Sequence, residues 1–542
     1  MATIIVNGKD VEIGDAERLN GIQIAARAGY DVPRYCWHPG LSVVASCRMC
    51  LVETGTKNFE TGQVQMLPKL VPACQTPAKH GTVFNTESDA VKKARAMVEE
   101  DLLLRHTVDC PICDKAGECQ LQDYHFEHGQ SERRADIKPF HSRRRDMGDT
   151  VTLFVDRCVM CSRCVRFTRE ISGQSELMVI NRGAHEEIDV FPGYPLANKM
   201  SGNVVDLCPV GALGDKDFLY EQRVWFMHSH DNVCAGCSTG CSIKIDENQD
   251  TVYRLKPREN PFINQWWMCD EGRYGYKHVH DPGRMVEPRR KDASGRFVNA
   301  EWSEIPGQLI ARLEKGKRLA AVLSPHLTVE EAYLLATLIR HHDANALISL
   351  GPVPVVGADE KFKNGFTIRA EKVPNRRGVE AIVSRLMNGS VPTFDDVLNA
   401  AEKGEIDGAW ITSGYKKDWI DAATAERLAG LELLIVQDAF HSPLWDIATF
   451  QLPSATFAER AGSYVNFADR LQSFTWAIRP PAGVMVEGKL YWQLLSRPGM
   501  YNPKAVLNEL ASEIMYFSAA AGGPIPPTGL DLKVNQLASI ST

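Results

Sequence analysis

The chain has no cysteine after Cys269, although fifteen cysteines lie between Cys36 and that residue. It also lacks an uninterrupted apolar stretch of the ~20 residues needed to cross a bilayer. Its first residues, MATIIVNG, contain neither the charged region nor the cleavage site of a secretion signal. No long basic tract is present and the formal net charge is −7, which argues against an extended nucleic-acid surface. We therefore expect a soluble, untargeted protein that reaches a membrane only through a partner.

The composition is that of a soluble globular protein. Apolar residues make up 44% and charged residues 24% of 542 residues, a length that predicts several domains. In a long chain without a secretion signal, clustered thiols indicate metal binding in a reducing compartment rather than disulfides. The cysteines therefore predict metal centres in the first half of the chain only.

The first cysteine group is Cys36, Cys47, Cys50 and Cys74. It follows an alternating segment, residues 4–13, in which Asn7-Gly8 predicts a hairpin turn. A plant-type [2Fe–2S] site has, in order, a first cysteine, a loop, a C-x2-C pair and a distant fourth cysteine. This sequence keeps that order with a longer first loop. An all-thiolate zinc site is the alternative.

The second group is Cys110, Cys113 and Cys119, which is one ligand short of four. A histidine nitrogen can replace a thiolate on iron, and His106 is the nearest candidate. Its alternative role is to close a helix expected over residues 90–105. The other candidates for the fourth ligand are His80, His125 and His128.

The third group, Cys158, Cys161 and Cys164 with the distant Cys208-Pro209, is the most informative. In a two-cluster ferredoxin, the fourth cysteine of such a run serves the other cluster, and here Thr168 stands in its place. The three partner positions before Cys208 are also not cysteines. They are Asn198, Ser201 and Val204. The pattern therefore predicts a single surviving [4Fe–4S] cluster.

The fourth group again supplies four thiolates, which suit either a [4Fe–4S] cluster or a structural zinc ion. Its members are Cys234, Cys237, Cys241 and Cys269. With His106 in the second group, the four groups account for all fifteen cysteines.

Four segments together resemble the large, 75-kDa-type iron–sulfur subunit family of NADH–quinone oxidoreductase, respiratory complex I. They are CRMCLVE (47–53), DCPICDKAGECQLQD (109–123), RCVMCSRCVRF (157–167) and GNVVDLCPVGAL (202–213). The resemblance implies one [2Fe–2S] cluster in the first group. It also implies a [4Fe–4S] cluster in the second group, held by His106 and three cysteines, and another [4Fe–4S] cluster in the third. It implies a further [4Fe–4S] cluster in the fourth group, of the kind held by only some bacterial members.

The second half, from about Arg284, resembles the molybdopterin oxidoreductase fold, most clearly in FAERAGSYVN (457–466) and RLQ (470–472). Apolar runs at 319–323 and 433–436 and helical periodicity over 329–341 predict alternating strands and helices. No cysteine is left to ligate molybdenum, and Ser324 or Ser413 is expected to be an ordinary surface or turn residue. We expect a shortened scaffold without molybdenum that ends in a linker-like tail at 522–527.

The predicted fold is therefore multidomain, α+β and α/β: a β-grasp [2Fe–2S] ferredoxin-like domain, [4Fe–4S] ferredoxin-like domains and a molybdopterin oxidoreductase-like α/β domain. The predicted domains are a [2Fe–2S] domain over 1–84, the histidine-ligated [4Fe–4S] domain over 85–125, a ferredoxin-like domain over 126–220, the four-cysteine domain over 221–283 and the scaffold over 284–542.

By resemblance, the function is electron transfer from NADH and a flavin toward quinone, with proton translocation by the whole complex. The chain would have no catalytic acid, base or nucleophile. Its partners would be the flavin- and NADH-binding subunit, other iron–sulfur subunits and, indirectly, the membrane arm, on the cytoplasmic side of a bacterial inner membrane. The alternatives are an iron–sulfur subunit of an NAD-linked formate dehydrogenase or hydrogenase, and a zinc-stabilised scaffold.

Overall fold

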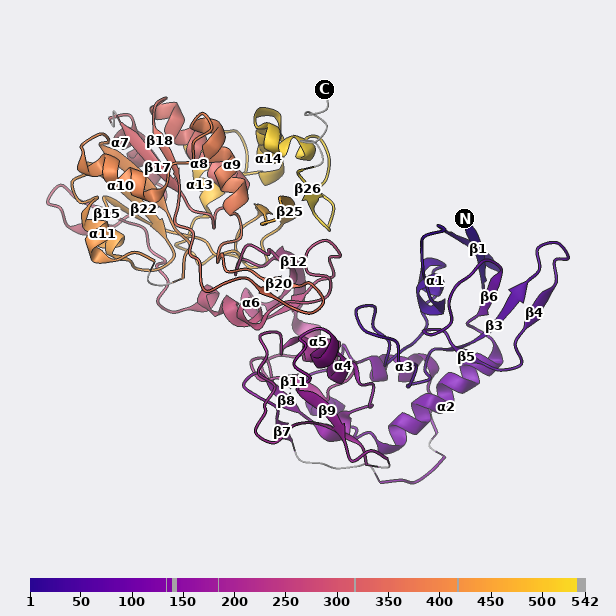
Figure 1. The fold of residues 1–542 in the computed structure, drawn as a ribbon. Helices are drawn as coiled ribbons and strands as arrows, with labels where there is room; N and C mark the ends of the chain where they lie inside the picture. Colours follow the sequence, from indigo (N-terminus) through magenta and orange to yellow (C-terminus); the bar gives the residue numbers. More distant parts are fainter. Residues whose placement is uncertain (133, 139–143, 184, 316–317, 417–418, 534–542) are drawn as a thin grey trace. The chain divides into compact units, whose positions relative to one another are not determined.

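The computed structural model describes residues 1–542 except 133, 139–143, 184, 316–317, 417–418 and 534–542. The chain divides into two compact units (Figure 1). The first is Met1–Met227 with Phe362–Gly365, and the second is His228–Lys361 with Phe366–Thr542. The first three cysteine groups lie in the first unit and the fourth lies in the second.

The first unit begins with a six-stranded mixed sheet of order β2-β1-β6-β3-β4, in which β5 pairs with β3. Asn7 (φ 50°) and Gly8 (φ 80°) form the tight turn between the first two strands, which confirms the predicted hairpin. One face of the sheet packs on α1 through a core that includes Ile4, Ile24 and Phe84. The elements are β1 (Ala2–Val6), β2 (Lys9–Ile13), α1 (Gly21–Arg27), β3 (Leu51–Lys57), β4 (Val64–Met66), β5 (Val71–Pro72) and β6 (Thr82–Asn85).

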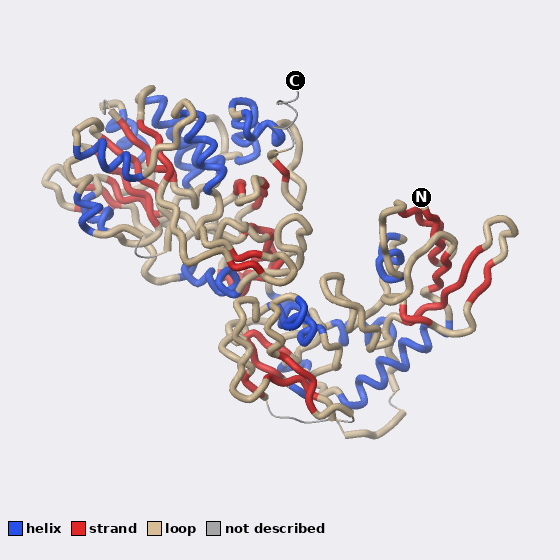
Figure 2. The backbone as a smooth tube through the Cα atoms, viewed as in Figure 1, coloured by secondary structure: helices blue, strands red, loops and turns tan. Residues whose placement is uncertain are grey.

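The rest of the first unit is mostly short elements joined by long loops, as the tube in Figure 2 shows. α2 (Asp89–Arg105) is capped by Ser88 and ends at His106, where the sequence predicts the helix to end. Two small antiparallel sheets follow, β11-β8-β7 and β10-β9. The remaining elements are η1 (Cys110–Ile112), α3 (Gln120–His128), β7 (Arg145–Asp146), β8 (Val151–Leu153), η2 (Val155–Arg157), α4 (Arg163–Glu170), β9 (Leu177–Ile180), β10 (Glu187–Val190), α5 (Asn203–Leu207), β11 (Leu213–Asp215) and η3 (Val224–Phe226).

The second unit opens with a three-stranded antiparallel sheet that carries the fourth cysteine group. The strands are β12 (His228–Val233), β13 (Ser242–Asn248) and β14 (Thr251–Pro257), followed by α6 (Asp270–Tyr274) and η4 (Gly275–His280). Cys234 and Cys241 bracket the loop between the first two strands, and Cys269 precedes α6.

A seven-stranded sheet of order β16-β15-β23-β22-β21-β17-β18 forms the centre of the second unit. Its last five strands are parallel, which confirms the predicted α/β layering. The strands are β15 (Arg289–Lys291), β16 (Phe297–Asn299), β17 (Leu319–Leu323), β18 (Leu347–Leu350), β21 (Gly408–Thr412), β22 (Leu433–Asp438) and β23 (Phe450–Pro453).

Helices cover both faces of this sheet because its strands are apolar on both sides. In β17, Leu319, Ala321 and Leu323 enter one hydrophobic core, and the alternate residues Ala320 and Val322 enter the other. On the first face lie α7 (Ile305–Leu313), α8 (Val329–His342), α9 (Arg376–Leu386), α13 (Glu487–Leu494), α14 (Pro503–Glu513) and η5 (Met515–Ala520); on the second lie α10 (Phe394–Glu402), α11 (Ala422–Glu426) and α12 (Pro443–Ile447).

The linker-like tail expected at 522–527 is wrong. This segment leads into β26 (Leu530–Asp531), which pairs with β25 (Arg470–Phe474), and Leu532 is buried. β25 also pairs with β24 (Gly462–Val465), and a separate hairpin joins β19 (Glu360–Lys361) to β20 (Thr367–Ile368). The apolar Leu530 and Leu532 return the chain to the core, a signal that the glycine and proline residues before them obscure. Among the described residues, no helix is long and apolar enough to cross a bilayer.

Candidate metal centres

All fifteen cysteines are free thiols, and none is fully exposed. Burial disfavours a charged thiolate unless a cation compensates it. Thiols gathered in groups of three or four and largely shielded from water are therefore a suitable environment for a positively charged metal centre, which would deprotonate them on binding.

In the first group, three cysteines lie on the loop that precedes β3, and Cys74 follows β5. The side chain of Cys36 is within hydrogen-bonding reach of Cys47 and Cys74, and Cys74 also reaches Cys50. The Cys36 backbone N–H points at the Cys47 sulfur at 3.5 Å. The contacts link all four sulfurs, with Cys36 and Cys74 at the centre of the set. The four predicted ligands therefore lie together and fit a [2Fe–2S] cluster.

The third group lines one small cavity. Cys158, Cys161, Cys164 and Cys208 all contribute to its wall, and most of the rest is apolar, including Leu153, Ile188 and Val210. Burial raises the pKa of Cys161 to about 11 and raises that of Cys164 well above its ordinary value. Apart from Ser162 and Arg163, the lining consists of four thiols and apolar residues, which suits a [4Fe–4S] cluster shielded from water.

The positions of the lost second cluster are filled by ordinary buried side chains. The Thr168 hydroxyl donates to the Val165 carbonyl at 3.1 Å, and the Asn198 amide donates to Glu176. Ser201 shares a hydrogen bond with Thr150, and Val204 is fully buried. These residues occupy the space with hydrogen bonds and packing, in agreement with a single cluster here.

In the second group, His106 caps the end of α2 and its Nδ1 atom is buried without a hydrogen-bond partner. Burial and the nearby Arg157 lower its pKa to about 4, so the ring is neutral and keeps a lone pair for a metal at neutral pH. Arg157 also lies close to Cys113, whose pKa it lowers against the effect of burial. Arg157 itself donates to Asp109 at 3.1 Å.

Two of the three rival histidines have other partners. The Nδ1 atom of His80 accepts from the Thr3 backbone N–H at 3.1 Å, and the ring stacks on Phe59. His128 lies 3.6 Å from Glu127. His125 resembles His106, since its Nδ1 atom is also buried and unpartnered. The choice of His106 stays a prediction, supported by the Arg157 neighbourhood that it shares with Cys113.

The fourth group is held by backbone contacts to its sulfurs. Cys269 caps α6, and its sulfur accepts from the Gly272 backbone N–H at 3.3 Å. The Cys234 sulfur accepts from Gly236 at 3.5 Å, and burial with Cys237 nearby raises the pKa of Cys234 to about 12. With Cys241 also buried, these thiols fit a bound cubane or a zinc ion equally well.

Zinc and an iron–sulfur cluster demand different spacing. Four thiolates on one zinc ion lie about 3.8 Å apart, whereas cluster thiolates lie farther apart because several metal and sulfide ions separate them. Within the part of the chain that the structure describes, no three His, Cys, Asp or Glu side chains converge on a point suited to a single ion.

Five family models match successive parts of the chain. They are a 2Fe-2S iron–sulfur cluster binding domain (1–89), the NADH-ubiquinone oxidoreductase-G iron–sulfur binding region (95–134), the ferredoxin-like domain of NADH-quinone oxidoreductase subunit 3 (148–214), the molybdopterin oxidoreductase Fe4S4 domain (227–281) and molybdopterin oxidoreductase (375–484). Each of the first four contains one of the cysteine groups.

Named relatives agree with these matches. An NADH-quinone oxidoreductase subunit from Rickettsia felis is 33% identical over 64% of this chain and 50% of its own length. The mitochondrial NADH dehydrogenase [ubiquinone] iron–sulfur protein 1 of Solanum tuberosum is 36% identical over 73% of this chain and 51% of its own length. The chain is a homologue of the large iron–sulfur subunit of NADH–quinone oxidoreductase.

This homologue spans about half the length of these relatives. A solved chain from an NAD+-reducing [NiFe]-hydrogenase aligns over 41% of this chain and 91% of its own length, with 24% identity and a TM-score of 0.34. At that score the alignment supports no conclusion about fold or function.

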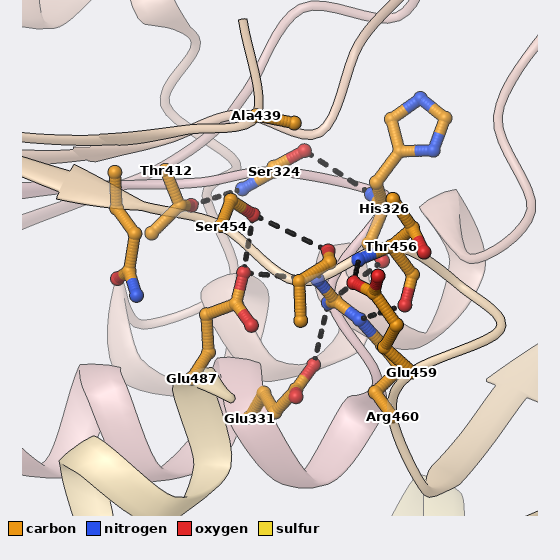
Figure 3. A network of polar contacts seen from close by, with 12 residues as sticks. Ser324, His326, Glu331, Thr412, Ala439, Ser454, Thr456, Glu459, Arg460 and Glu487 are labelled. Carbon is orange, nitrogen blue, oxygen red and sulfur yellow. Dashed lines mark hydrogen bonds and ion pairs between the residues drawn. The ribbon is translucent and has the colours of Figure 1, made fainter. Parts of the chain in front are cut away.

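In the molybdopterin-like part of this homologue, the charged side chains at the strand ends pair with one another. At the carboxyl ends of the parallel strands, a small cavity is lined by residues such as His326, Lys416 and Arg460. Figure 3 shows the polar network that lies there. Arg460 donates to Glu331 at 2.8 Å and to Glu487 at 2.9 Å, so its charge is already balanced.

The two serines considered as metal ligands are turn residues, as one part of that expectation has it, but they are buried rather than on the surface. Ser324 follows β17 and is fully buried, and Ser413 follows β21 and is 3% exposed. The Ser324 backbone N–H donates to the Thr412 hydroxyl at 2.9 Å, and its own hydroxyl accepts from the His326 N–H (Figure 3). They are buried because strand ends of a sheet covered on both faces lie inside the molecule. Both serve as turn residues.

Sequence reasoning missed three residues that shape the centres. Arg163 and Arg166 of α4 are 5% and 2% exposed and donate to backbone carbonyls around the first and third groups. Gly211 lies so close to the second group that a Cβ atom there would come within 2.1 Å of the Cys113 sulfur. Two signals were available in the sequence. They are the arginines beside the third-group cysteines and the glycine that follows Cys208-Pro209.

Proposed function

We propose that this chain is the electron-transfer subunit of an NADH–quinone oxidoreductase, holding a chain of iron–sulfur clusters between a flavin and quinone. The observation that carries this is the third group: four cysteines, three of them buried, line one small and mainly apolar cavity in a segment that matches a complex I ferredoxin-like domain. The cluster ligands proposed are those of the four groups, with His106 completing the second.

When bound, each cluster supplies a site that accepts and passes one electron. The chain's own residues hold the clusters, exclude water and set the local charge. In this arrangement the third group adjoins the first group and the second group. The Arg166 guanidinium bonds the carbonyls of Cys36 and Cys161, and the Gln120 N–H donates to the Pro209 carbonyl at 2.9 Å. The contacts support a relay in which the third group lies between the first and the second.

The second group borders an apolar surface suited to a partner. Ile112, Trp225 and Phe226 are each more than half exposed, and Arg223 donates to the carbonyls of Cys110 and Cys113, which holds η3 against η1. Exposed apolar patches commonly mark protein interfaces. We propose that another iron–sulfur subunit docks on this apolar patch, Ile112, Trp225 and Phe226, and that a flavin- and NADH-binding subunit supplies electrons elsewhere on the chain.

The remaining parts of the proposal concern the whole complex. Proton translocation would take place in the membrane arm, with this chain peripheral on the cytoplasmic side of a bacterial inner membrane. No residue of the chain is assigned as a catalytic acid, base or nucleophile.

A reduction assay tests the proposed function. The full chain, purified anaerobically, is mixed with the flavin-binding subunit and NADH, and the bleaching of the iron–sulfur absorbance is followed. We expect bleaching that requires both NADH and the flavin-binding partner. A chain that holds its clusters but stays oxidised under these conditions would contradict the proposal.

A further inference from the structure

Two buried arginines lie between the first and third cysteine groups. Arg163 and Arg166 occupy one face of α4, which begins directly after the Cys161-Ser162 pair and carries Cys164. Their exposed fractions are 5% and 2%. A buried guanidinium is costly unless negative charge compensates it.

Both side chains bridge the two groups through backbone carbonyls. Arg166 donates to the carbonyl of Cys36 in the first group and, at 3.3 Å, to that of Cys161 in the third. Arg163 donates to the carbonyl of Trp37 at 2.8 Å and to that of Leu207, next to Cys208, at 3.2 Å. Each arginine therefore contacts the ligand loops of both groups.

No carboxylate balances these two charges within the described residues. Two other buried arginines, by contrast, are closely paired: Arg157 with Asp109 at 3.1 Å and Arg284 with Glu459 at 2.6 Å. The hydrogen bonds that Arg163 and Arg166 donate all go to neutral carbonyl oxygens, and both Nε atoms are buried without a hydrogen-bond partner. Cys36 and Cys161, whose carbonyls Arg166 contacts, would carry negative charge as thiolates.

Bound clusters would supply the negative charge that these buried arginines lack. Cysteine-ligated clusters carry net negative charge because their thiolates and sulfides outweigh the iron.

We propose that Arg163 and Arg166 form a shared cationic bridge that raises the reduction potentials of the clusters held by the first and third groups. The inference rests on the proposed function. In the transfer step one electron leaves one cluster and enters the other, and no bond forms or breaks. Each reduction adds negative charge beside the same two guanidinium groups, so the bridge stabilises both reduced states. The arginines are positioning residues, since they touch the ligand loops and transfer no electron.

The test is a redox titration of the full chain followed by electron paramagnetic resonance. The neutral variants Arg163→Gln and Arg166→Gln are compared with Arg166→Lys, which keeps the charge. The matched control is Arg34→Gln, because Arg34 lies in the same neighbourhood but is partly exposed and paired with Asp31 at 2.7 Å. The third-group signal is identified by its loss in a Cys164→Ser variant, and iron per chain is measured throughout.

We expect each Gln variant to keep its iron and to shift the midpoint potentials of both clusters downward. Arg166→Lys is expected to keep the midpoint potentials close to those of the wild type, and Arg34→Gln is expected to change these potentials little. If Arg166→Gln loses iron, the midpoint potentials of Arg163→Gln and Arg166→Lys are compared with those of the wild type instead. Unchanged midpoints in iron-replete variants, or a shift no larger than that of Arg34→Gln, would overturn the bridge. A wild-type chain without iron would instead overturn the proposed function.

Discussion

At the scale of single residues, His106 is the ligand assignment that most needs a decision. Its neutral ring, buried Nδ1 atom and proximity to Arg157 suit a metal ligand, but His125 also has a buried, unpartnered Nδ1 atom. The sequence distance to Cys110 favours His106, and a pair of substitutions separates the two histidines.

We predict that His106→Cys retains the second cluster but lowers its midpoint potential, because a thiolate adds negative charge where imidazole adds none. His106→Ala should reduce iron by about four atoms per chain, one cubane. Iron analysis and a redox titration by electron paramagnetic resonance measure both effects. His125→Cys is the control, and a potential that shifts in this control but not in His106→Cys would transfer the assignment to His125.

A second prediction at this scale concerns Glu330. It lies in the first turn of α8, is 1% exposed and accepts from the Ser463 N–H and hydroxyl, both at 2.8 Å. Burial raises its pKa from 4.5 to about 7. The folded state therefore holds a proton that the unfolded state releases between these pH values, so stability falls as pH rises from about 4.5 to 7.

Glu330→Gln should remove this loss. We expect the variant to be more stable than the parent by about 1–3 kcal/mol at pH 8 and nearly equal at pH 5. Thermal unfolding of the second unit at the two pH values measures the difference. Glu426→Gln, on the exposed face of α11, is the control and should show no such dependence. An equal difference at both pH values would show that charge burial is not its cause.

At the scale of elements, the turn between Cys208 and β11 sets the spacing of the second and third groups. A Cβ atom on Gly211 would lie 2.1 Å from the Cys113 sulfur and 3.3 Å from Lys115. The backbone of this turn and the sulfur of the neighbouring group therefore share a space that only glycine permits.

Gly211→Ala is accordingly expected to displace Cys113 and lose the second cluster while the third remains. Iron per chain should fall by about four atoms, and one [4Fe–4S] signal should disappear. Gly14→Ala serves as the control, since a Cβ atom there meets only Glu17 at an ordinary 3.7 Å. Full iron content in Gly211→Ala would show that the backbone can move aside.

The sequence predicts most of these elements because their signals are local. The Asn7-Gly8 hairpin, the helix ending at His106 and the strand 319–323 follow from turn chemistry, capping and apolar runs. The bridging of two groups by Arg163 and Arg166 could not be predicted, because it depends on residues about 130 positions away in sequence. Spacing identifies candidate ligands, whereas the charges around them come from tertiary packing.

At the scale of the whole molecule, the apolar patch of Ile112, Trp225 and Phe226 links the chain to a partner. We predict that Phe226→Glu, at a position 56% exposed, leaves iron content unchanged but weakens binding to the iron–sulfur partner subunit by at least tenfold. Binding of purified subunits measures this. Phe262→Glu, 64% exposed in the second unit, is the matched control. Equal binding by both variants would remove the patch from the interface.

Metal content tests the central claim most directly. The full chain is purified anaerobically, iron and zinc per chain are measured, and electron paramagnetic resonance is recorded after dithionite reduction. The account predicts about fourteen iron atoms, with [2Fe–2S] and [4Fe–4S] signals. About ten iron atoms would leave the fourth group empty or zinc-bound. Zinc with little iron, even after reconstitution, would contradict the account and leave a metal-stabilised scaffold.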